Sequence, residues 1–143
     1  MAKNRRALFD YEILDTVEAG IQLTGQEVKA ARMGHVNLAG SYVLFQQDRP
    51  ILRNAAIAQY PYTTGLENYQ PNRDRPLLLH GAENAKLQAA VAERGVSLIA
   101  LEVRAGRTIK VLLGLGRGRK ILDKRQRIKE REMDRKIQKG QEY

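Results

Sequence analysis

The stretch "VSLIALEVRAGRTIKVLLGLG", residues 96–116, decides what kind of fold this chain adopts. Two long apolar runs flank the short polar segment "RAGR", residues 104–107, which contains a glycine suited to a tight turn. The pattern predicts a β-hairpin close to the C-terminal end of a β-rich domain.

Further strands are predicted between the N-terminus and this hairpin. The segment "YEILDTVEAGIQL", residues 11–23, mixes β-branched and aromatic residues around Gly20, and predicts two strands that meet at a turn or bulge. The segments "SYVLFQ", residues 41–46, and "PILRNAAIAQY", residues 50–60, predict two more strands, and the polar "QDRP" between them predicts the turn of a second hairpin.

Two helices and one long loop complete the pattern. Residues 26–33 have helical spacing, and Gly34 follows at the position where a left-handed cap is favoured. Residues 77–95 place leucine, alanine and valine at near-helical intervals and end on Gly95. Residues 61–76 are rich in proline, asparagine, threonine and arginine without periodicity, and predict a loop.

The order of these elements favours a mainly β protein with helices (α+β). Five or six strands with two or three helices between them fit a small closed barrel of the oligonucleotide-binding kind better than a helical bundle or a parallel sheet. A chain of 143 residues holds one such domain and an appendage. We expect a body at residues 1–118 and a basic C-terminal tail at residues 119–143.

The net charge of +9 is concentrated at the C-terminus. Residues 116–143 carry 11 Lys or Arg against 5 Asp or Glu, and so hold six of the nine surplus charges. This distribution predicts an anionic partner, nucleic acid before a membrane surface. Arg73 and Arg75 in the predicted loop extend the charge toward a continuous RNA path.

The tail cannot build a core of its own. Its apolar residues form no wide helical stripe, although its content of Lys, Arg, Glu and Gln favours helix. We expect the tail to be disordered when free and helical once a polyanion neutralises it.

The sequence argues against an enzyme, a metal site or a bound cofactor. The absence of cysteine excludes disulfides and thiolate chemistry, and no zinc-protease, nucleophile-elbow or Walker-type motif is present. We expect Glu12, Glu18 and Glu27 to be solvated surface carboxylates rather than an acid–base pair. No apolar run suits a signal peptide or a membrane span, so a cytoplasmic protein is expected.

Several short motifs carry a family resemblance. In chain order they are "DYEI" (10–13), "EAGI" (18–21), "GQEVK" (25–29), "GSYV" (40–43), "LLLH" (77–80), "GLGRGRK" (114–120), "DKR" (123–125) and "IKERE" (128–132). This ordered set resembles the bacterial small protein B (SmpB) family, the partners of transfer-messenger RNA (tmRNA).

The resemblance implies a binding protein without chemistry of its own. It implies an oligonucleotide-binding barrel that grips the tRNA-like domain of tmRNA and is delivered, with elongation factor Tu, to ribosomes stalled without a stop codon. The tail would lie in the empty mRNA channel at the decoding centre, and alanyl-tRNA synthetase would be reached only through tmRNA. We expect a monomer. The alternative is a ribosomal or ribosome-assembly protein, which explains charge and fold but not the ordered motifs.

Site residues follow from the resemblance position by position. The implied RNA-gripping face comprises Asn4, Arg5, Arg6, Tyr11, Glu18, Leu78 and Lys110. The implied ribosome-binding tail comprises Gly114, Gly116, Arg117, Gly118, Arg119, Lys120, Asp123, Lys124, Arg125, Ile128 and Met133. Lysine and arginine suit phosphate, Tyr11 and Leu78 suit unstacked bases, and Glu18 can accept hydrogen bonds from base or ribose.

The chain departs from the family pattern at Leu8, Phe9, Pro76 and Leu122. The family usually has a basic residue and a histidine at the first two positions, a lysine at the third, and a histidine or tyrosine at the fourth. The N-terminal contact is therefore expected to be less basic here, and Leu122 is expected to pack against a base without a ring to stack on it.

Overall fold

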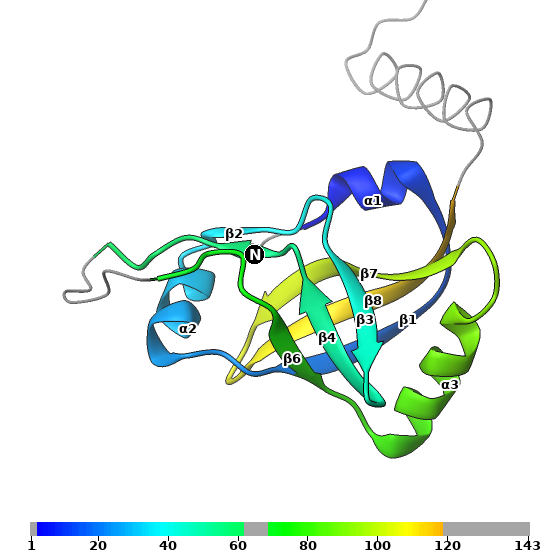
Figure 1. The fold of residues 1–143 in the computed structure, drawn as a ribbon. Helices are drawn as coiled ribbons and strands as arrows, with labels where there is room; N and C mark the ends of the chain where they lie inside the picture. Colours follow the sequence, from blue (N-terminus) through cyan, green and yellow to red (C-terminus); the bar gives the residue numbers. More distant parts are fainter. Residues whose placement is uncertain (1–2, 62–68, 119–143) are drawn as a thin grey trace, which may run out of the picture.

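The computed structural model describes residues 3–61 and 69–118 (Figure 1). Its elements are α1 (Arg5–Asp10), β1 (Tyr11–Ile21), α2 (Gly25–Arg32), β2 (Val36–Asn37), β3 (Tyr42–Gln46), β4 (Arg49–Arg53), β5 (Ala56–Ile57), β6 (Arg75–Leu78), α3 (Gly81–Val91), β7 (Val96–Ala105) and β8 (Ile109–Gly118). The prediction of a mainly β protein with helices is confirmed.

Six antiparallel strands form a closed barrel in the order β1-β6-β4-β3-β7-β8, and β2 and β5 form a separate two-stranded sheet. The predicted hairpin of residues 96–116 is confirmed as β7 and β8, which pair from Val96↔Arg117 to Ala105↔Ile109. β8 also pairs along most of β1, from Tyr11↔Gly118 to Gly20↔Lys110. The hairpin is therefore the centre of the most extensively paired part of the barrel.

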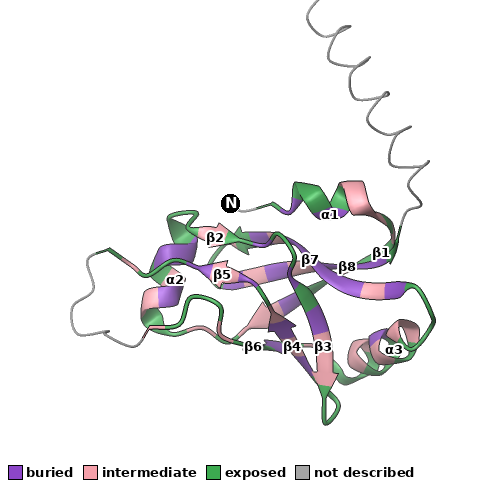
Figure 2. Ribbon diagram, turned by 45° about the horizontal axis from the view of Figure 1, so that its top comes forward, coloured by how far each residue is buried: buried purple, intermediate pink, exposed green. Residues whose placement is uncertain are grey.

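Alternation along β8 builds the core. Every second side chain points into the barrel and is buried, in the order Ile109, Val111, Leu113 and Leu115. β7 is different, because its run from Leu98 to Leu101 is buried on both faces. Ile99 and Leu101 pack outside the barrel against Ala7 of α1. Figure 2 shows these buried positions gathered along β7 and β8.

Both predicted helices are confirmed within one to four residues of their expected ends. Thr24 caps α2 in a capping box with Glu27, and Gly34 follows with φ +80°. α3 ends at Val91, and Gly95 takes φ +83° three residues beyond the cap.

The prediction that Gly20 separates two strands is wrong. β1 runs unbroken through Gly20, and its irregularity lies between Ile13 and Asp15. A Cβ at position 20 would lie 3.3 Å from the Cβ of Leu78 on β6, so the glycine allows these strands to approach closely.

Three other expectations need correction. The predicted strand 50–60 divides at Asn54, whose φ of 65° ends β4 before β5 begins. The turn before β4 is made by Gln47 and Asp48, both with positive φ, so Pro50 is paired in a strand. β6 begins inside the predicted 61–76 loop. The helix α1 has only six residues and was not predicted from periodicity.

Candidate nucleic-acid interface

Four adjacent strands present one line of outward-facing residues at the hairpin end of the barrel. Arg104 of β7 is the Cα partner of Lys110 of β8. Lys110 is also the Cα partner of Gly20 of β1, and Gly20 in turn is the Cα partner of Leu78 of β6. We call Arg104, Lys110, Gly20 and Leu78 the cross-strand row. Leu78 is 57% exposed, and Gly20 leaves the surface beside it flat.

Glu18 lies on the same outer face, two residues before Gly20 along β1. Arg104 Nη1 lies 3.4 Å from Glu18 Oε2, and Arg104 Nε lies 3.4 Å from Glu102 Oε1. Because the side chains of Arg104 and Glu18 are exposed, their ion pair adds little stability and remains open to exchange with a charged ligand. The cross-strand row and Glu18 together therefore offer two cations, a carboxylate and an apolar side chain.

Arg104 is a candidate that the sequence interpretation missed. The sequence pattern could have identified Arg104. Arg104 and Lys110 are placed symmetrically about the turn of the predicted hairpin, so their side chains lie on the same face, opposite the buried Val103 and Val111.

The structure does not bring the seven predicted RNA-binding residues onto one face. Tyr11 pairs with Gly118 at the other end of β1, nine residues from Gly20, or about 30 Å along an extended strand. Arg5 and Arg6 lie on α1, at that same end (Figure 1). The predicted residues thus form two groups, one on the cross-strand row with Glu18 and one around α1.

Asn4, one of the predicted RNA-binding residues, is buried and has a structural role. Its side chain is buried, Nδ2 donates to the carbonyls of Leu38 and Ala100 at 3.0 and 2.9 Å, and Oδ1 accepts from the Ala7 amide at 3.2 Å. Asn4 therefore caps α1 and fastens it to the barrel, which leaves Arg5 and Arg6 exposed at its surface.

Gly114, Gly116, Arg117 and Gly118 belong to β8, not to a tail. A Cβ at Gly116 would lie 2.9 Å from the Cβ of Tyr11, and one at Gly114 would lie 2.7 Å from Leu101 Cδ1. These two glycines thus allow close packing of neighbouring side chains. The other predicted tail residues, Arg119, Lys120, Asp123, Lys124, Arg125, Ile128 and Met133, lie outside the described residues, as does Leu122.

The expectation that Glu27 is a solvated carboxylate is wrong, and Arg75 is not available to an RNA path. Both side chains are fully buried, and Arg75 Nε and Nη2 donate to Glu27 Oε2 at 2.9 and 2.7 Å. Arg73, one-third exposed, also binds this carboxylate through Nε and Nη2. Burial alone would raise the pKa of Glu27, but hydrogen bonds from Arg73, the Thr24 amide and Arg75 outweigh it and lower that pKa to about 2.

Neither a metal cluster nor a membrane-crossing helix emerges from residues 3–61 and 69–118. No group of three or more His, Asp or Glu side chains there is placed to hold a metal ion. No helix in this part of the chain is long and apolar enough to cross a membrane.

These features define a class: a small antiparallel barrel with exposed cations on its strand face and a strongly basic C-terminal segment. A family model described as SmpB protein matches residues 1–143. The chain belongs to the SmpB family.

Individual relatives agree with this assignment. The chain is 44% identical to an SsrA-binding protein of Chlorobaculum tepidum, over 94% of this chain and 87% of that protein. It is 45% identical to an SsrA-binding protein of Synechococcus sp. strain JA-3-3Ab, over 96% and 90% respectively. A solved structure concerned with tmRNA–SmpB and the bacterial ribosome is similar with a TM-score of 0.70 and 43% identity, covering 84% of this chain and 85% of that chain.

Proposed function

We propose that this protein is a tmRNA-binding adaptor of trans-translation, which serves ribosomes stalled without a stop codon. Family membership and relatives named for SsrA binding support this role. The structural observation that carries it is the cross-strand row, since two outward-facing cations beside an exposed apolar side chain are suited to RNA.

The barrel is an oligonucleotide-binding fold whose hairpin end grips the tRNA-like domain. Lys110 and Arg104 bind phosphates and set the register of the RNA, while Leu78 packs against an unstacked base. Glu18 accepts a hydrogen bond from a base or ribose donor. Tyr11, Arg5 and Arg6 contact RNA at the opposite end of β1.

The body of residues 1–118 binds tmRNA, and the tail of residues 119–143 binds the ribosome. The tail enters the empty mRNA channel and decoding centre, where RNA phosphates neutralise its charge and it becomes helical, with Ile128 and Met133 as apolar contacts. Elongation factor Tu and alanyl-tRNA synthetase are engaged through tmRNA. The protein acts in the cytoplasm as a monomer and performs no chemistry of its own.

The test is binding of the purified full chain to a folded tRNA-like transcript and to an ordinary tRNA at the same salt concentration. The adaptor role requires tighter binding to the tRNA-like transcript. Equal affinity for the two RNAs would instead support the ribosomal or ribosome-assembly alternative.

Deletion of the tail tests whether the body and the tail have separate roles. Deletion after Gly118 should leave affinity for the tRNA-like transcript largely intact and abolish tagging of stalled peptides. Loss of both properties together would show that the tail also serves to grip tmRNA.

A further inference from the structure

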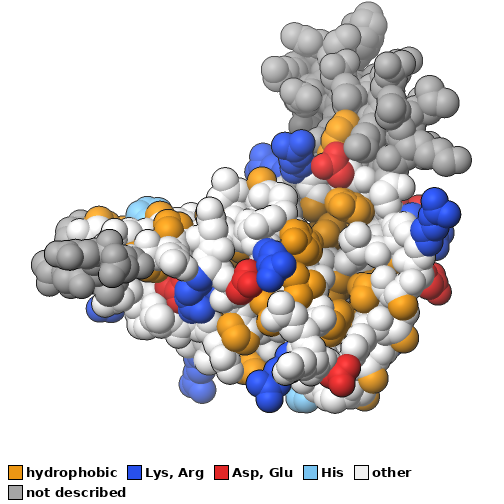
Figure 3. Space-filling model, in the orientation of Figure 1, with side chains coloured by type: hydrophobic (Ala, Val, Ile, Leu, Met, Phe, Trp, Pro, Cys, Tyr) orange, Lys and Arg blue, Asp and Glu red, His pale blue; other side chains and the backbone are white. Residues whose placement is uncertain are grey.

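A groove of about 840 Å³ lies on the outer face of the barrel beside Leu78, the apolar end of the cross-strand row. It reaches from the end of β1 across β6 to the turn between β3 and β4 (Figure 1). Figure 3 shows this side of the molecule, where apolar side chains and single basic side chains lie over β4 and β6. None of the described residues that line the groove is acidic. The volume falls within the range of about 300–1,000 Å³ that is usual for ligand clefts.

Two prolines account for the opening of the groove. In the described structure β4 and β6 pair only at Ile51↔Pro76 and Leu52↔Arg75. The next residue of β4 toward the turn is Pro50, which has no amide hydrogen to donate to β6, and Pro76 has none either. The ladder between the two strands therefore stops at Pro76, and the groove opens beyond it.

The groove continues the cross-strand row onto two further strands. The register of β4 and β6, continued for two residues, sets Arg49 opposite Leu78, and both residues line the groove. The Cα partner of Arg49 on β3 is Gln46, which also lines it. Gln22 lies two residues beyond Gly20, on the same outer face as the strand β1, and completes the lining at that end.

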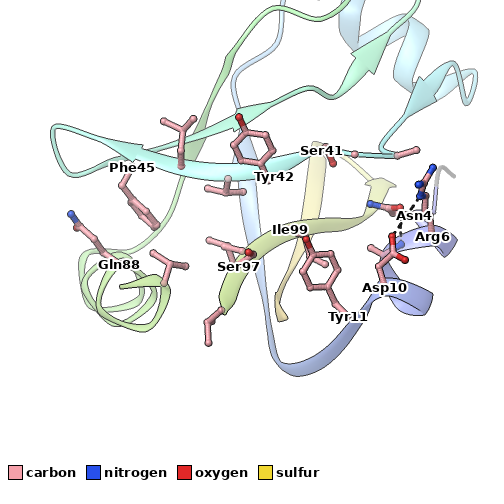
Figure 4. A pocket seen from close by; sticks show the side chains of 18 of the residues that line it. Asn4, Arg6, Asp10, Tyr11, Ser41, Tyr42, Phe45, Gln88, Ser97 and Ile99 are labelled. Carbon is pink, nitrogen blue, oxygen red and sulfur yellow. Dashed lines mark hydrogen bonds and ion pairs between the residues drawn. The ribbon is translucent and has the colours of Figure 1, made fainter. Parts of the chain in front are cut away.

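Arg49 is an exposed cation without a partner among the described residues. Its guanidinium forms neither an ion pair nor a hydrogen bond with them. The adjacent carboxylate of Asp48 is engaged by α3, because Gln88 Nε2 donates to Asp48 Oδ1 at 2.8 Å. Asn84 Nδ2 of the same helix donates to the Asp48 carbonyl at 2.8 Å, and Figure 4 shows Gln88 on α3 beside Phe45 of β3. The helix thus holds the β3–β4 turn and leaves Arg49 available to an external anion.

Three glutamine side chains add hydrogen-bonding groups along the groove. Gln22, Gln46 and Gln47 are exposed, and their amide groups form no hydrogen bond with the described residues. A primary amide donates and accepts at once, so it can bond to the edge of a base, as glutamine does with adenine. Phosphate contacts carry no sequence information, whereas such amide contacts do. The groove therefore combines a group for phosphate with groups for base edges.

A peptide suits this groove less well than RNA. A peptide that adds a strand to a sheet needs backbone N–H groups as well as carbonyls along the sheet edge. Pro50 and Pro76 remove amide hydrogens from both sides of the groove. The absence of acidic residues from the described lining, the net charge of +9 and the continuity with the cross-strand row favour a polyanion.

We propose that the groove binds the nucleotide next to the one that packs on Leu78, with Arg49 at its phosphate and the amides of Gln22 and Gln46 at its base edge. The RNA is the tRNA-like domain, because Leu78 belongs both to the groove and to the cross-strand row. The inference rests on the proposed function and adds to it an element that reads sequence. The groove thereby contributes to the choice of the tRNA-like domain over an ordinary tRNA.

Arg49→Ala in the full chain tests the phosphate contact. We expect the affinity for a folded tRNA-like transcript to fall about 3- to 10-fold and the slope of log affinity against log salt to fall by about one unit. Arg49→Lys should retain most of the affinity, because lysine also binds phosphate. Lys86→Ala removes an exposed cation of α3 that does not line the groove, and should change neither quantity. Thermal unfolding of these surface variants should match the wild type.

The double variant Gln22→Ala and Gln46→Ala tests base recognition. Its affinity is measured for the tRNA-like transcript and for an ordinary tRNA at the same salt concentration. We expect the preference for the tRNA-like transcript to fall by about 5-fold or more, the effect of one lost base contact. Gln26→Ala removes an amide of α2 outside the groove, and should leave the preference unchanged. An equal loss of affinity for the two RNAs would show that the amides do not read a base, and would overturn the proposal.

Lys110→Ala, measured in parallel, separates this inference from the proposed function. If Lys110→Ala weakens binding to the tRNA-like transcript while the Arg49 and glutamine variants keep the wild-type affinity and preference, the adaptor role stands and the groove proposal fails. If the wild type shows no preference and none of the variants changes any affinity, both fail. Loss of peptide tagging in Arg49→Ala with unchanged affinity for both RNAs would assign the groove to another partner and would also overturn the proposal.

Discussion

Glu27 and Arg75 form a fully buried ion pair, with Arg75 Nη2 2.7 Å from Glu27 Oε2. The pair joins the first turn of α2 to the first residue of β6 across 48 positions of sequence. Arg75 also donates to the carbonyls of Ala55 and Pro71 at 2.7 and 2.8 Å. One carboxylate therefore anchors the start of the strand that ends at Leu78.

Neutralising Glu27 should strongly destabilise the fold. Glu27→Gln leaves the Arg75 charge buried without compensation, so we expect the free energy of unfolding to fall by about 3–5 kcal/mol. Urea unfolding at neutral pH measures this. Asp74→Asn is the matched control, because the Arg53–Asp74 pair has a similar distance of 2.9 Å but is exposed, and its loss should cost no more than about 1 kcal/mol. A similar loss of unfolding free energy in both variants would contradict the difference in burial between the Glu27–Arg75 and Arg53–Asp74 pairs.

The same carboxyl group predicts a loss of stability in acid. The pKa of Glu27 is lowered in the folded protein from 4.5 to about 2, so its contribution is complete above the unfolded value and is lost as pH falls from about 4.5 to about 2. The shift corresponds to about 3 kcal/mol. Urea unfolding across this pH window should show the decline, and Glu27→Gln should show a flatter profile. Identical profiles for the two proteins would assign the acid sensitivity to other groups.

Two glycines of β8 should respond differently to the same substitution. The Cβ of Gly116→Ala would lie 2.9 Å from the Cβ of Tyr11, an atom held by its own strand, so we expect a loss of about 1–3 kcal/mol in the free energy of unfolding. Gly118→Ala meets nothing within 4 Å and should change stability by less than about 0.5 kcal/mol. Thermal and urea unfolding compare the two variants, and equal stability would show that β1 and β8 can separate without cost.

Arg104 should contribute to RNA binding through phosphate. Arg104→Ala is expected to weaken binding to a tRNA-like transcript and to reduce the slope of log affinity against log salt by about one unit. Lys86→Ala removes an exposed cation of α3, away from the cross-strand row, and is the matched control. An unchanged salt dependence in Arg104→Ala would remove this residue from the interface.

Asn4→Ala should act through the attachment of α1. The change removes three hydrogen bonds and leaves the buried carbonyls of Leu38 and Ala100 without this donor, for an expected loss of about 2–4 kcal/mol. Hydrogen exchange at the Ala7 amide should accelerate. Asn37→Ala, which removes only an exposed bond to the Ala39 amide, should cost less than about 1 kcal/mol. Weaker RNA binding with unchanged stability would instead favour a direct contact by Asn4.

Local patterns explain which elements were predictable. The β7–β8 hairpin follows from two apolar runs around a glycine-containing turn, and α2 follows from helical spacing that ends at Gly34. The helix α1 gave too weak a pattern, because six residues make less than two turns and its cap, Asn4, is a single residue.

The sequence by itself determined the hairpin, the main helices, the basic C-terminal segment and the motif order of the SmpB family, because turn chemistry, periodicity and charge are local properties of the chain. Only the tertiary structure decided that Arg75 is buried, that Arg104 joins Lys110 beside Leu78, and that Tyr11 lies far from them. Strand register and burial depend on contacts between segments tens of residues apart. A local sequence pattern therefore cannot predict which charged side chain, such as Arg75, becomes buried when these segments pack together.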